Sequence, residues 1–380
     1  MRASLLLEEC LSAGIDFFTG VPDSFLKGLC DELYSRFGTD SSSHIVAHNE
    51  GGAIGLCAGH YIATGRPALC YMQNSGLGNA VNPLTSLTDS KVYGIPCLLV
   101  IGWRGEPGTK DEPQHIMQGQ ITLQQLDLLD IPYRILSPDT PDDAFQSDFS
   151  FICSVMEKRC PAAFVIRKGA LTTDQHPAYG NANSMTREQA AGIIISNISG
   201  SDLIVSTTGK LSREIFEIRE RNHEPHYRDF LTVGSMGHAV MIALGMCEQL
   251  PGRRVWCLDG DGAAMMHLGA MALIGQRAPA NLIHVVINNG AHETVGGMPV
   301  CSGSLNLSAL AKAAGYTAVM SADSDQSLSE ILASLDNLSG PVFIEVKCAC
   351  GARADLGRPT IAPRDNLNDM MKFITKSSQI

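Results

Sequence analysis

A chain of 380 residues is too long for one ordinary core, because domains usually hold ~100–200 residues, so two domains are expected. Hydrophobic residues make up 44% of the chain and charged residues 18%, which excludes intrinsic disorder as its main state. The 28 Lys and Arg residues against 39 Asp and Glu residues give a net charge of −11 without a basic run, so no nucleic-acid partner is expected.

The first residues hold a three-Leu stretch that Glu8 and Glu9 stop, which is too short for a signal peptide or a membrane span. We therefore expect a cytoplasmic protein with no membrane partner. Through the first half, apolar β-rich runs alternate with helical patterns, which is typical of βαβ units. The predicted strands cover residues 16–19, 44–47, 68–72, 97–101, 133–136 and 163–166, the predicted helices cover residues 5–13, 24–37, 51–64, 76–87 and 141–157, and a long loop covers residues 102–119.

The second half repeats this alternation, with a helix over residues 263–275 and strands over residues 203–206, 254–258, 282–287, 317–321 and 342–346. A polar, turn-rich stretch between the halves follows neither period. The sequence therefore predicts an α/β fold of two doubly wound parallel-sheet domains without a third domain between them. We expect the domains at residues 1–170 and 186–360, a linker at residues 171–185 and a C-terminal tail at residues 361–380.

A glycine-rich turn follows the predicted strand 254–258. Asp259-Gly-Asp-Gly262 leads from this strand into a helix, so backbone amides and a helix N-terminus suit an anion there. Asp261 at the same turn implies a divalent cation between the two negative charges. The next strand ends in Asn288-Asn289, after a spacer of 25 residues (263–287), and parallel strands bring such ends to one rim. Each motif alone also fits an ordinary turn.

Gly-Asp-Gly, a spacer of this length and Asn-Asn resemble the signature of thiamine-diphosphate-dependent enzymes. The resemblance implies a Mg²⁺ ion held by Asp261, the side chain of Asn289 and the backbone carbonyl of Ala291. It also implies that Gly260, Gly262 and Ala263 contact the cofactor, and that the first domain binds its pyrimidine and the second its diphosphate.

Glu50 follows the strand 44–47 and opens a helix, where a carboxylate is usually only a favourable partner of the helix dipole. The resemblance implies a catalytic role, in which Glu50 hydrogen-bonds the aminopyrimidine ring and promotes its imino form. The segment Gly234-Ser235-Met236 is similar to the family motif whose apolar side chain bends the cofactor, so Ser235 and Met236 are assigned to cofactor binding. Because family members take the glutamate and the diphosphate site from different chains, the resemblance implies at least a homodimer with interfacial sites.

The family includes decarboxylases, carboligases, oxidases and dehydrogenases, so the cofactor does not fix the reaction. The two-domain layout, the segment 19–24 and the loop 103–115 resemble phosphonopyruvate and sulfopyruvate decarboxylases. This resemblance implies a carboxy-lyase, and the expected reaction is the non-oxidative decarboxylation of 3-phosphonopyruvate to phosphonoacetaldehyde and CO₂, as in phosphonate biosynthesis. Sulfopyruvate decarboxylase is one alternative, disfavoured because that enzyme is often split into two subunits. A carboligase and a non-enzymatic regulatory subunit are the others, and the intact motifs disfavour the latter.

A dianionic 2-oxo acid needs fixed cations and neutral donors in its pocket. Arg104 and Lys110 on the long loop are the candidate cations, although both also fit surface ion pairs with acidic neighbours. Further candidate residues are Asn74 and Ser75 for substrate binding, His115 and Asp23 for proton handling, and, with structural roles favoured for both, His238 and His292.

Overall fold

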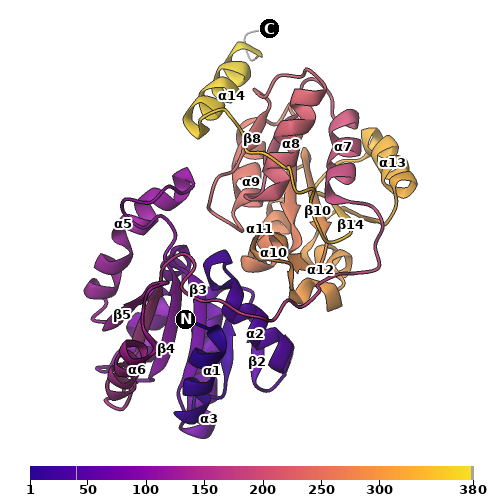
Figure 1. Ribbon diagram of the computed structural model, residues 1–380. Helices are drawn as coiled ribbons and strands as arrows, with labels where there is room; N and C mark the ends of the chain where they lie inside the picture. The colour runs from indigo at the N-terminus through magenta and orange to yellow at the C-terminus, as the bar shows by residue number, and fades with distance from the viewer. Residues whose placement is uncertain (40, 378–380) are drawn as a thin grey trace. The chain divides into compact units, whose positions relative to one another are not determined.

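The computed structural model describes residues 1–39 and 41–377, and the chain divides into two compact units (Figure 1). The first unit is Met1–Ala178 and the second is Tyr179–Ile380. The division lies inside the stretch 171–185 that the composition indicated as a linker. Among the described residues, no helix combines the length and the apolar character that a membrane span requires.

The first unit is built on a six-stranded sheet in which every pair of neighbours is parallel. The strand order is β2-β1-β3-β4-β6-β5. The strands are β1 (Phe18–Gly20), β2 (His44–Val46), β3 (Ala68–Gln73), β4 (Cys97–Gly102), β5 (Tyr133–Leu136) and β6 (Ala162–Ile166), and the helices are α1 (Ala3–Ser12), α2 (Lys27–Phe37), α3 (Glu50–Thr64), α4 (Leu77–Pro83), α5 (Pro113–Leu128) and α6 (Asp142–Met156).

Both faces of this sheet are buried, as expected for parallel strands that are joined by helices. On one face, alternate residues of β3 and β4 such as Cys70 and Leu99 pack with Ile54 of α3. On the other face, Phe164 of β6 contacts Phe145 of α6, with ring centroids 5.9 Å apart. Successive strand residues therefore supply two separate apolar layers, which fixes the register of each strand.

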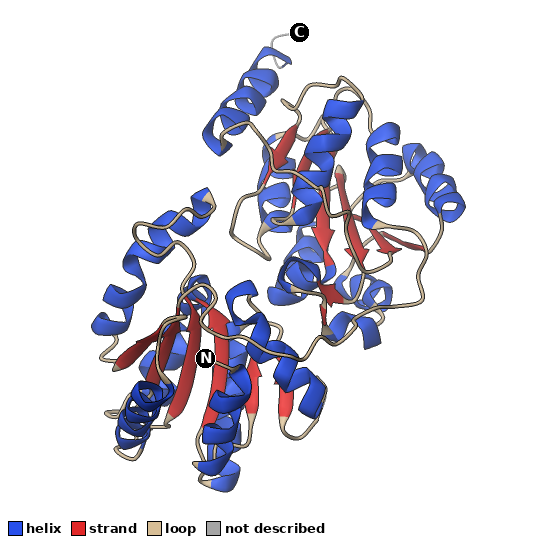
Figure 2. Ribbon diagram, in the orientation of Figure 1, coloured by secondary structure: helices blue, strands red, loops and turns tan. Residues whose placement is uncertain are grey.

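The second unit has the same architecture, with helices around a six-stranded parallel sheet (Figure 2). Its strand order is β13-β14-β10-β9-β7-β8, and a short antiparallel pair, β11-β12, lies apart. The strands are β7 (Leu203–Ser206), β8 (Asp229–Leu231), β9 (Val255–Gly260), β10 (Leu282–Asn288), β11 (Ala291–His292), β12 (Met298–Pro299), β13 (Ala318–Ala322) and β14 (Val342–Lys347), and the helices are α7 (Arg187–Asn197), α8 (Lys210–Arg221), α9 (Ala239–Gln249), α10 (Asp261–Met266), α11 (Gly269–Arg277), α12 (Leu307–Ala314), α13 (Asp325–Ser334) and α14 (Pro363–Ser377).

The central strands of the second unit alternate between two cores. Ile283 and Ile287 of β10 pack with residues of α7, α8 and α13 on one face. Leu282 and Val286 of the same strand pack with residues of α9, α11 and α12 on the other face. The predicted fold class, an α/β fold of two doubly wound parallel sheets, is therefore confirmed.

Each sheet has a point at which the chain reverses the direction in which it adds strands. In the first unit this point lies between β1 and β3, and in the second unit it lies between β7 and β9. Open α/β sheets bind ligands in the crevice that such a reversal leaves at the carboxyl ends of the strands. The residues that directly follow β7 and β9 are therefore the first place to look for a site.

Among the elements that the sequence prediction did not give are the helix α5 and the strand β8. The predicted loop 102–119 is wrong in its second half, because α5 begins at Pro113. Pro is favoured in the first turn of a helix, but the apolar residues of α5 form no clear stripe, and Ile116 and Met117 are exposed. The missed strand, β8, has only three residues and lies at the edge of its sheet, so it carries little periodic signal.

Two further predictions need correction. The single helix predicted over residues 263–275 is two helices, α10 and α11, because the backbone leaves the helical region at His267 (φ −130°, ψ 53°). The region described as a tail contains the helix α14, which is tied to the edge strand: the side-chain amide of Asn366 accepts from Leu231 N and donates to Asp229 O.

Candidate active site

The glycine-rich turn of the second unit fixes one buried carboxylate. β9 ends at Gly260 and α10 begins at Asp261, whose side chain is 3% exposed. Its Oδ2 accepts hydrogen bonds from Ser302 Oγ at 2.5 Å and from Gly290 N at 3.1 Å. Burial raises the pKa of Asp261 to about 6, because hydrogen bonds to the ionised form only partly offset its loss of solvation.

Asn289 lies beside this carboxylate because β10 runs parallel to β9, with Ile287 paired to Gly260. The side chain of Asn289 is held at both ends: Oδ1 accepts from Ala291 N at 3.2 Å, and Nδ2 donates to Glu293 Oε2 at 3.1 Å. The turn after β10 is thus ordered by its own hydrogen bonds, and its Gly290 amide contacts Asp261 directly.

The oxygen atoms of Asp261, Asn289 and Ala291 are suitable ligands for a hard divalent cation. A carboxylate, an amide oxygen and a backbone carbonyl are the ligands that Mg²⁺ and Ca²⁺ prefer, and a bound cation would stabilise the ionised form of the buried Asp261. The group predicted from the sequence, which is Asp261, Asn289 and Ala291, is buried: the three residues are 3, 5 and 7% exposed.

Two residues from other loops converge on the same turn. Met236 Cε lies 3.6 Å from the position that a Cβ at Gly262 would take. Thr207 Cγ2 lies 3.8 Å from the corresponding position at Gly260. Thr207 directly follows β7 and is 5% exposed, yet its Oγ1 has no hydrogen-bond partner among the described residues. Such an orphaned hydroxyl at the reversal point of the sheet fits a polar ligand. The sequence prediction missed Thr207, although its place after a predicted strand is a usable signal.

In this neighbourhood, Ser235 is exposed and its backbone is in the left-handed region (φ 46°). Of the two histidines considered, His238 is exposed, whereas His292 has Cε1 3.7 Å from a Cβ at Gly262. Burial lowers the pKa of His292 to about 4, so its ring is neutral at pH 7.

In the first unit, Glu50 is held in a fixed position at the start of α3. Asn49 caps this helix by accepting a hydrogen bond from Gly52 N at 2.7 Å. The carboxylate of Glu50 is 5% exposed and its Oε2 accepts from Asn79 Nδ2 at 2.8 Å. It also lies against Gly76, where a Cβ would be 2.6 Å from Glu50 Oε1. Asn79 and Gly76 are partners that sequence reasoning missed.

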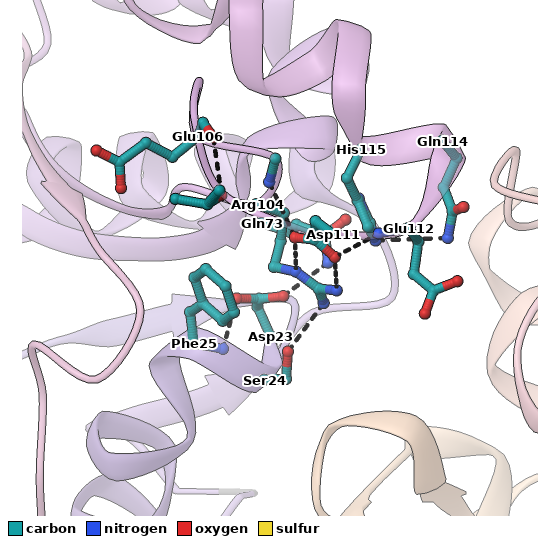
Figure 3. A network of polar contacts seen from close by, with 12 residues as sticks. Asp23, Ser24, Phe25, Gln73, Arg104, Glu106, Asp111, Glu112, Gln114 and His115 are labelled. Atoms are coloured by element: carbon teal, nitrogen blue, oxygen red, sulfur yellow. Dashed lines mark hydrogen bonds and ion pairs between the residues drawn. The ribbon is translucent and has the colours of Figure 1, made fainter.

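A second polar cluster of this unit surrounds Asp23 (Figure 3). Asp23 is fully buried after β1; its Oδ2 accepts from Phe25 N at 2.8 Å and its Oδ1 accepts from Gln73 Nε2 at 2.6 Å. Burial raises the pKa of Asp23, although these hydrogen bonds oppose the shift. The carboxyl group therefore holds a proton to a higher pH than an ordinary aspartate does.

Arg104 belongs to the same cluster and is paired (Figure 3). Its Nε and one terminal nitrogen bind the two carboxylate oxygens of Asp111 at 2.8 and 2.5 Å, and the other terminal nitrogen donates to Ser24 Oγ at 3.0 Å. Burial alone would raise the pKa of Asp111, but hydrogen bonds from Arg104 and from two backbone amides bring that pKa below its ordinary value. Arg104 is therefore one half of a neutral pair rather than a free cation.

The other predicted substrate residues divide into two groups. Asn74 joins the cluster, since its Nδ2 donates to Arg104 O and to Thr122 Oγ1, both at 2.8 Å. Ser75 and Lys110 are exposed, and Ser75 Oγ donates to Gln73 Oε1 at 2.7 Å. The structure thus brings Asn74 to Arg104 but does not place Lys110 in the cluster.

His115 lies in the first turn of α5 and not in a loop, which corrects the prediction. The residue is 8% exposed, and its Nδ1 has no hydrogen-bond partner among the described residues. Burial, with a smaller contribution from the charge of Arg104, lowers the pKa of His115 to about 4. At neutral pH the ring is therefore uncharged and can accept a proton.

Comparisons with known proteins agree with this geometry. Residues 1–128 match the N-terminal TPP binding domain of thiamine pyrophosphate (TPP) enzymes. Residues 207–346 match the C-terminal TPP binding domain of the same enzymes. The phosphonopyruvate decarboxylase of Streptomyces viridochromogenes is 34% identical over 98% of this chain and 95% of its own. The sulfopyruvate decarboxylase of Methanosarcina acetivorans is 25% identical over 90% of this chain and 89% of its own.

The alpha subunit of sulfopyruvate decarboxylase from Methanococcus maripaludis is 41% identical over 38% of this chain and 83% of its own. Because the Methanosarcina enzyme matches both halves in one chain, the fusion of the two halves does not separate the two classes of decarboxylase. The chain belongs to the thiamine pyrophosphate (thiamine diphosphate) enzyme family, uses that cofactor and is one of the family's 2-oxo acid decarboxylases.

Proposed function

We propose that this enzyme decarboxylates 3-phosphonopyruvate to phosphonoacetaldehyde and CO₂ and requires Mg²⁺. The observation that carries the proposal is the likeness to a phosphonopyruvate decarboxylase along almost the whole of both chains, at 34% identity against 25% for the full-length sulfopyruvate decarboxylase. The paired Arg104 in a half-buried polar cluster supports a substrate with a second anionic group.

In this proposal the second unit holds the metal and the diphosphate. Asp261, the side chain of Asn289 and the carbonyl of Ala291 would bind Mg²⁺, and the amides of the Gly260–Ala263 turn would face the diphosphate. The orphaned hydroxyl of Thr207 and the side chain of Met236 would line the same place. Bound thiamine diphosphate supplies the sink for the electrons that remain when CO₂ leaves.

Glu50 would act on the pyrimidine ring of the cofactor. Its buried carboxylate is an acceptor that Asn79 and the packing against Gly76 keep in one place. A carboxylate fixed in this way can hold a proton at a ring nitrogen without first having to change its own conformation, which is the benefit of proximity.

The cluster around Asp23 and Arg104 would receive the substrate. Arg104 carries five N–H donors, and in the described part of the chain only three of them have partners. The remaining two can donate to an oxyanion while Asp111 keeps the guanidinium in place. Asp23, with its raised pKa, and the neutral His115 are the candidates for moving a proton near the reacting carbon.

Sulfopyruvate is a second candidate substrate. A sulfopyruvate decarboxylase alpha subunit is 41% identical over 38% of this chain, and the neutral pair of Arg104 with Asp111 suits a single negative charge as well as a double one. The deciding experiment measures CO₂ and aldehyde release from phosphonopyruvate, sulfopyruvate and pyruvate. The proposal requires the highest kcat/KM for phosphonopyruvate and is overturned if sulfopyruvate exceeds it. Equal turnover of pyruvate would contradict an anion-binding pocket.

We also propose that the chain forms at least a homodimer whose sites combine Glu50 of one copy with Asp261 of another. A groove of about 570 Å³ runs along α3, lined by Gly52, Gly55 and Gly59, and supports close approach of a second chain. The test mixes Glu50→Gln and Asp261→Ala proteins, each inactive alone. After random exchange of dimer subunits, half of the dimers are mixed and each holds one intact site, so about a quarter of wild-type activity is expected. No recovery after demonstrated exchange would contradict shared sites.

A further inference from the structure

Beneath the proposed metal-binding turn lies a buried polar cluster that the proposed function does not use. Cys257 and Asp259 are two residues apart on β9, so they face the same side of the sheet. His284 of β10 is paired with Cys257 and faces that side too. All three residues are 0% exposed, and one ligand atom of each lies within 4.8 Å of the others.

The side-chain contacts form a continuous series that ends at the turn itself. Asp259 Oδ1 accepts a hydrogen bond from Gly260 N at 2.9 Å. Asp259 Oδ2 faces His284 Nε2 at 3.6 Å, and neither atom has a hydrogen-bond partner among the described residues. The other ring nitrogen, His284 Nδ1, lies 2.9 Å from Tyr316 OH. Polar groups therefore connect Tyr316, two residues after the end of α12, with Gly260, the residue that precedes Asp261.

One assignment of protons points each of these polar groups at its neighbour, although the contact between His284 and Asp259 is longer than a hydrogen bond. Tyr316 OH donates to Nδ1 of a neutral His284, whose Nε2–H points at Asp259 Oδ2, while Oδ1 keeps the amide of Gly260. The surroundings are apolar, and Phe343 packs edge-on against the His284 ring with centroids 5.5 Å apart. Polar groups in such a core lower the stability of the fold unless they are paired. The cluster is therefore suited to orienting the residues that it connects rather than to apolar packing.

We infer that Tyr316 and His284 are positioning residues that act through Asp259 to hold the Gly260–Asp261 turn in its metal-binding geometry. The inference rests on the proposed role of Asp261 as a metal ligand. A turn held from below by a fixed carboxylate keeps the Asp261 carboxylate oriented before the ion arrives, which lowers the cost of binding it.

Cys257 is close enough to suggest a second metal centre, with a cysteine, an aspartate and a histidine as ligands. A thiol binds such metals as the thiolate, and burial raises the pKa of Cys257 well above its ordinary value. The arrangement of Tyr316, His284 and Asp259 described above is built without Cys257, which is therefore an apolar neighbour of these residues. This residue is therefore a matched control, because it lies on the same face with the same burial.

The test measures Mn²⁺ binding by electron paramagnetic resonance, with thiamine diphosphate present and without substrate. Tyr316→Phe, which removes only the hydroxyl, is expected to weaken Mn²⁺ binding about five-fold, and His284→Leu about ten-fold or more. Cys257→Ala is expected to lower the melting temperature and leave Mn²⁺ affinity within two-fold of the wild type. At saturating metal, Tyr316→Phe should retain the wild-type kcat.

Wild-type Mn²⁺ affinity in both Tyr316→Phe and His284→Leu would overturn the inference and reduce the cluster to core packing. One equivalent of a transition metal that Asp261→Ala retains and Cys257→Ala loses would overturn it in favour of a metal centre. Because no substrate is added, the result is independent of which 2-oxo acid the enzyme uses. Failure of the wild-type protein to bind Mn²⁺ would overturn the inference together with the proposed metal site.

Discussion

Gly76 sets the position of the proposed catalytic carboxylate, and replacing it with alanine tests that arrangement. The new Cβ would lie 2.5 Å from Glu50 Cγ, 2.6 Å from Oε1 and 2.7 Å from Cδ. Non-bonded carbon atoms rest at ~3.5–4.0 Å, so the carboxylate must move by about 1 Å. Gly76 itself has φ −70° and ψ −18°, which alanine adopts without strain, so the effect of the substitution is purely steric.

A shift of about 1 Å in a positioned group costs ~10²-fold in rate, and overpacking at a buried site costs ~1–3 kcal/mol of stability. We therefore expect Gly76→Ala to lower kcat about 100-fold, with a loss no larger than that of Glu50→Gln. Gly78 provides the control, because it lies in α4, is exposed and has no atom within 4 Å of its added Cβ. Gly78→Ala should keep full activity and be slightly more stable, by up to about 1 kcal/mol.

The assay is steady-state decarboxylation at saturating thiamine diphosphate and Mg²⁺, with thermal unfolding of the same samples. Stability and activity must be read together, since a misfolded variant would lose both. A folded Gly76→Ala enzyme whose kcat stays within two-fold of the wild type would refute the reasoning. It would mean that the Glu50 carboxylate does not need its observed position, and hence that it does not act on the cofactor as proposed.

Three further predictions concern the polar clusters. Arg104→Lys loses the bidentate pair with Asp111, so kcat/KM for phosphonopyruvate should fall ~10–100-fold and that for pyruvate should hardly change in initial-rate assays. The folded-state pKa of His115, about 4, lies below the unfolded value of 6.5, so its contribution to stability is complete above pH 6.5 and is lost as the pH falls towards 4. Urea unfolding at pH 7.5 and 4.5 measures how much unfolding free energy is lost on acidification, and this loss should be smaller in His115→Gln than in the wild type by up to about 3 kcal/mol. An equal loss in both proteins would contradict the prediction. Ser302→Ala removes the 2.5 Å hydrogen bond to Asp261 and should raise the Mg²⁺ concentration for half-maximal activity about ten-fold; an unchanged Mg²⁺ curve would contradict this.

The sequence was informative where function depends on short segments at strand ends. Glu50, Asp261 and Asn289 each follow a predicted strand, and the parallel topology that the alternating pattern predicts places Asp261 and Asn289 on one rim. The strands 133–136 and 203–206 were predicted to the residue, because apolar β-rich runs bounded by turns carry a strong local signal.

What the sequence could not give depends on contacts between distant segments. Ser302 lies 41 residues after Asp261, in a short 3-10 turn, and nothing in its neighbourhood marks it as a partner of that carboxylate. Gly76 reads as one more turn glycine until the packing brings Glu50 against it. The helix α5 was missed because its apolar residues form no stripe. Such features follow from tertiary packing, which a local pattern does not encode.

The neutral pair formed by Arg104 and Asp111 limits how the substrate can be selected. Since the pair carries no net charge, it attracts a distant anion only weakly. Under the proposed function, selection therefore depends on short-range hydrogen bonds from the two N–H groups of Arg104 that have no partner among the described residues. A phosphonate or a sulfonate can accept these bonds, whereas the methyl group of pyruvate would leave them unpaired in a half-buried site. The proposed role of the cluster thus predicts that pyruvate is rejected but predicts no choice between the two anions, which is why the comparison of phosphonopyruvate with sulfopyruvate decides the proposed function.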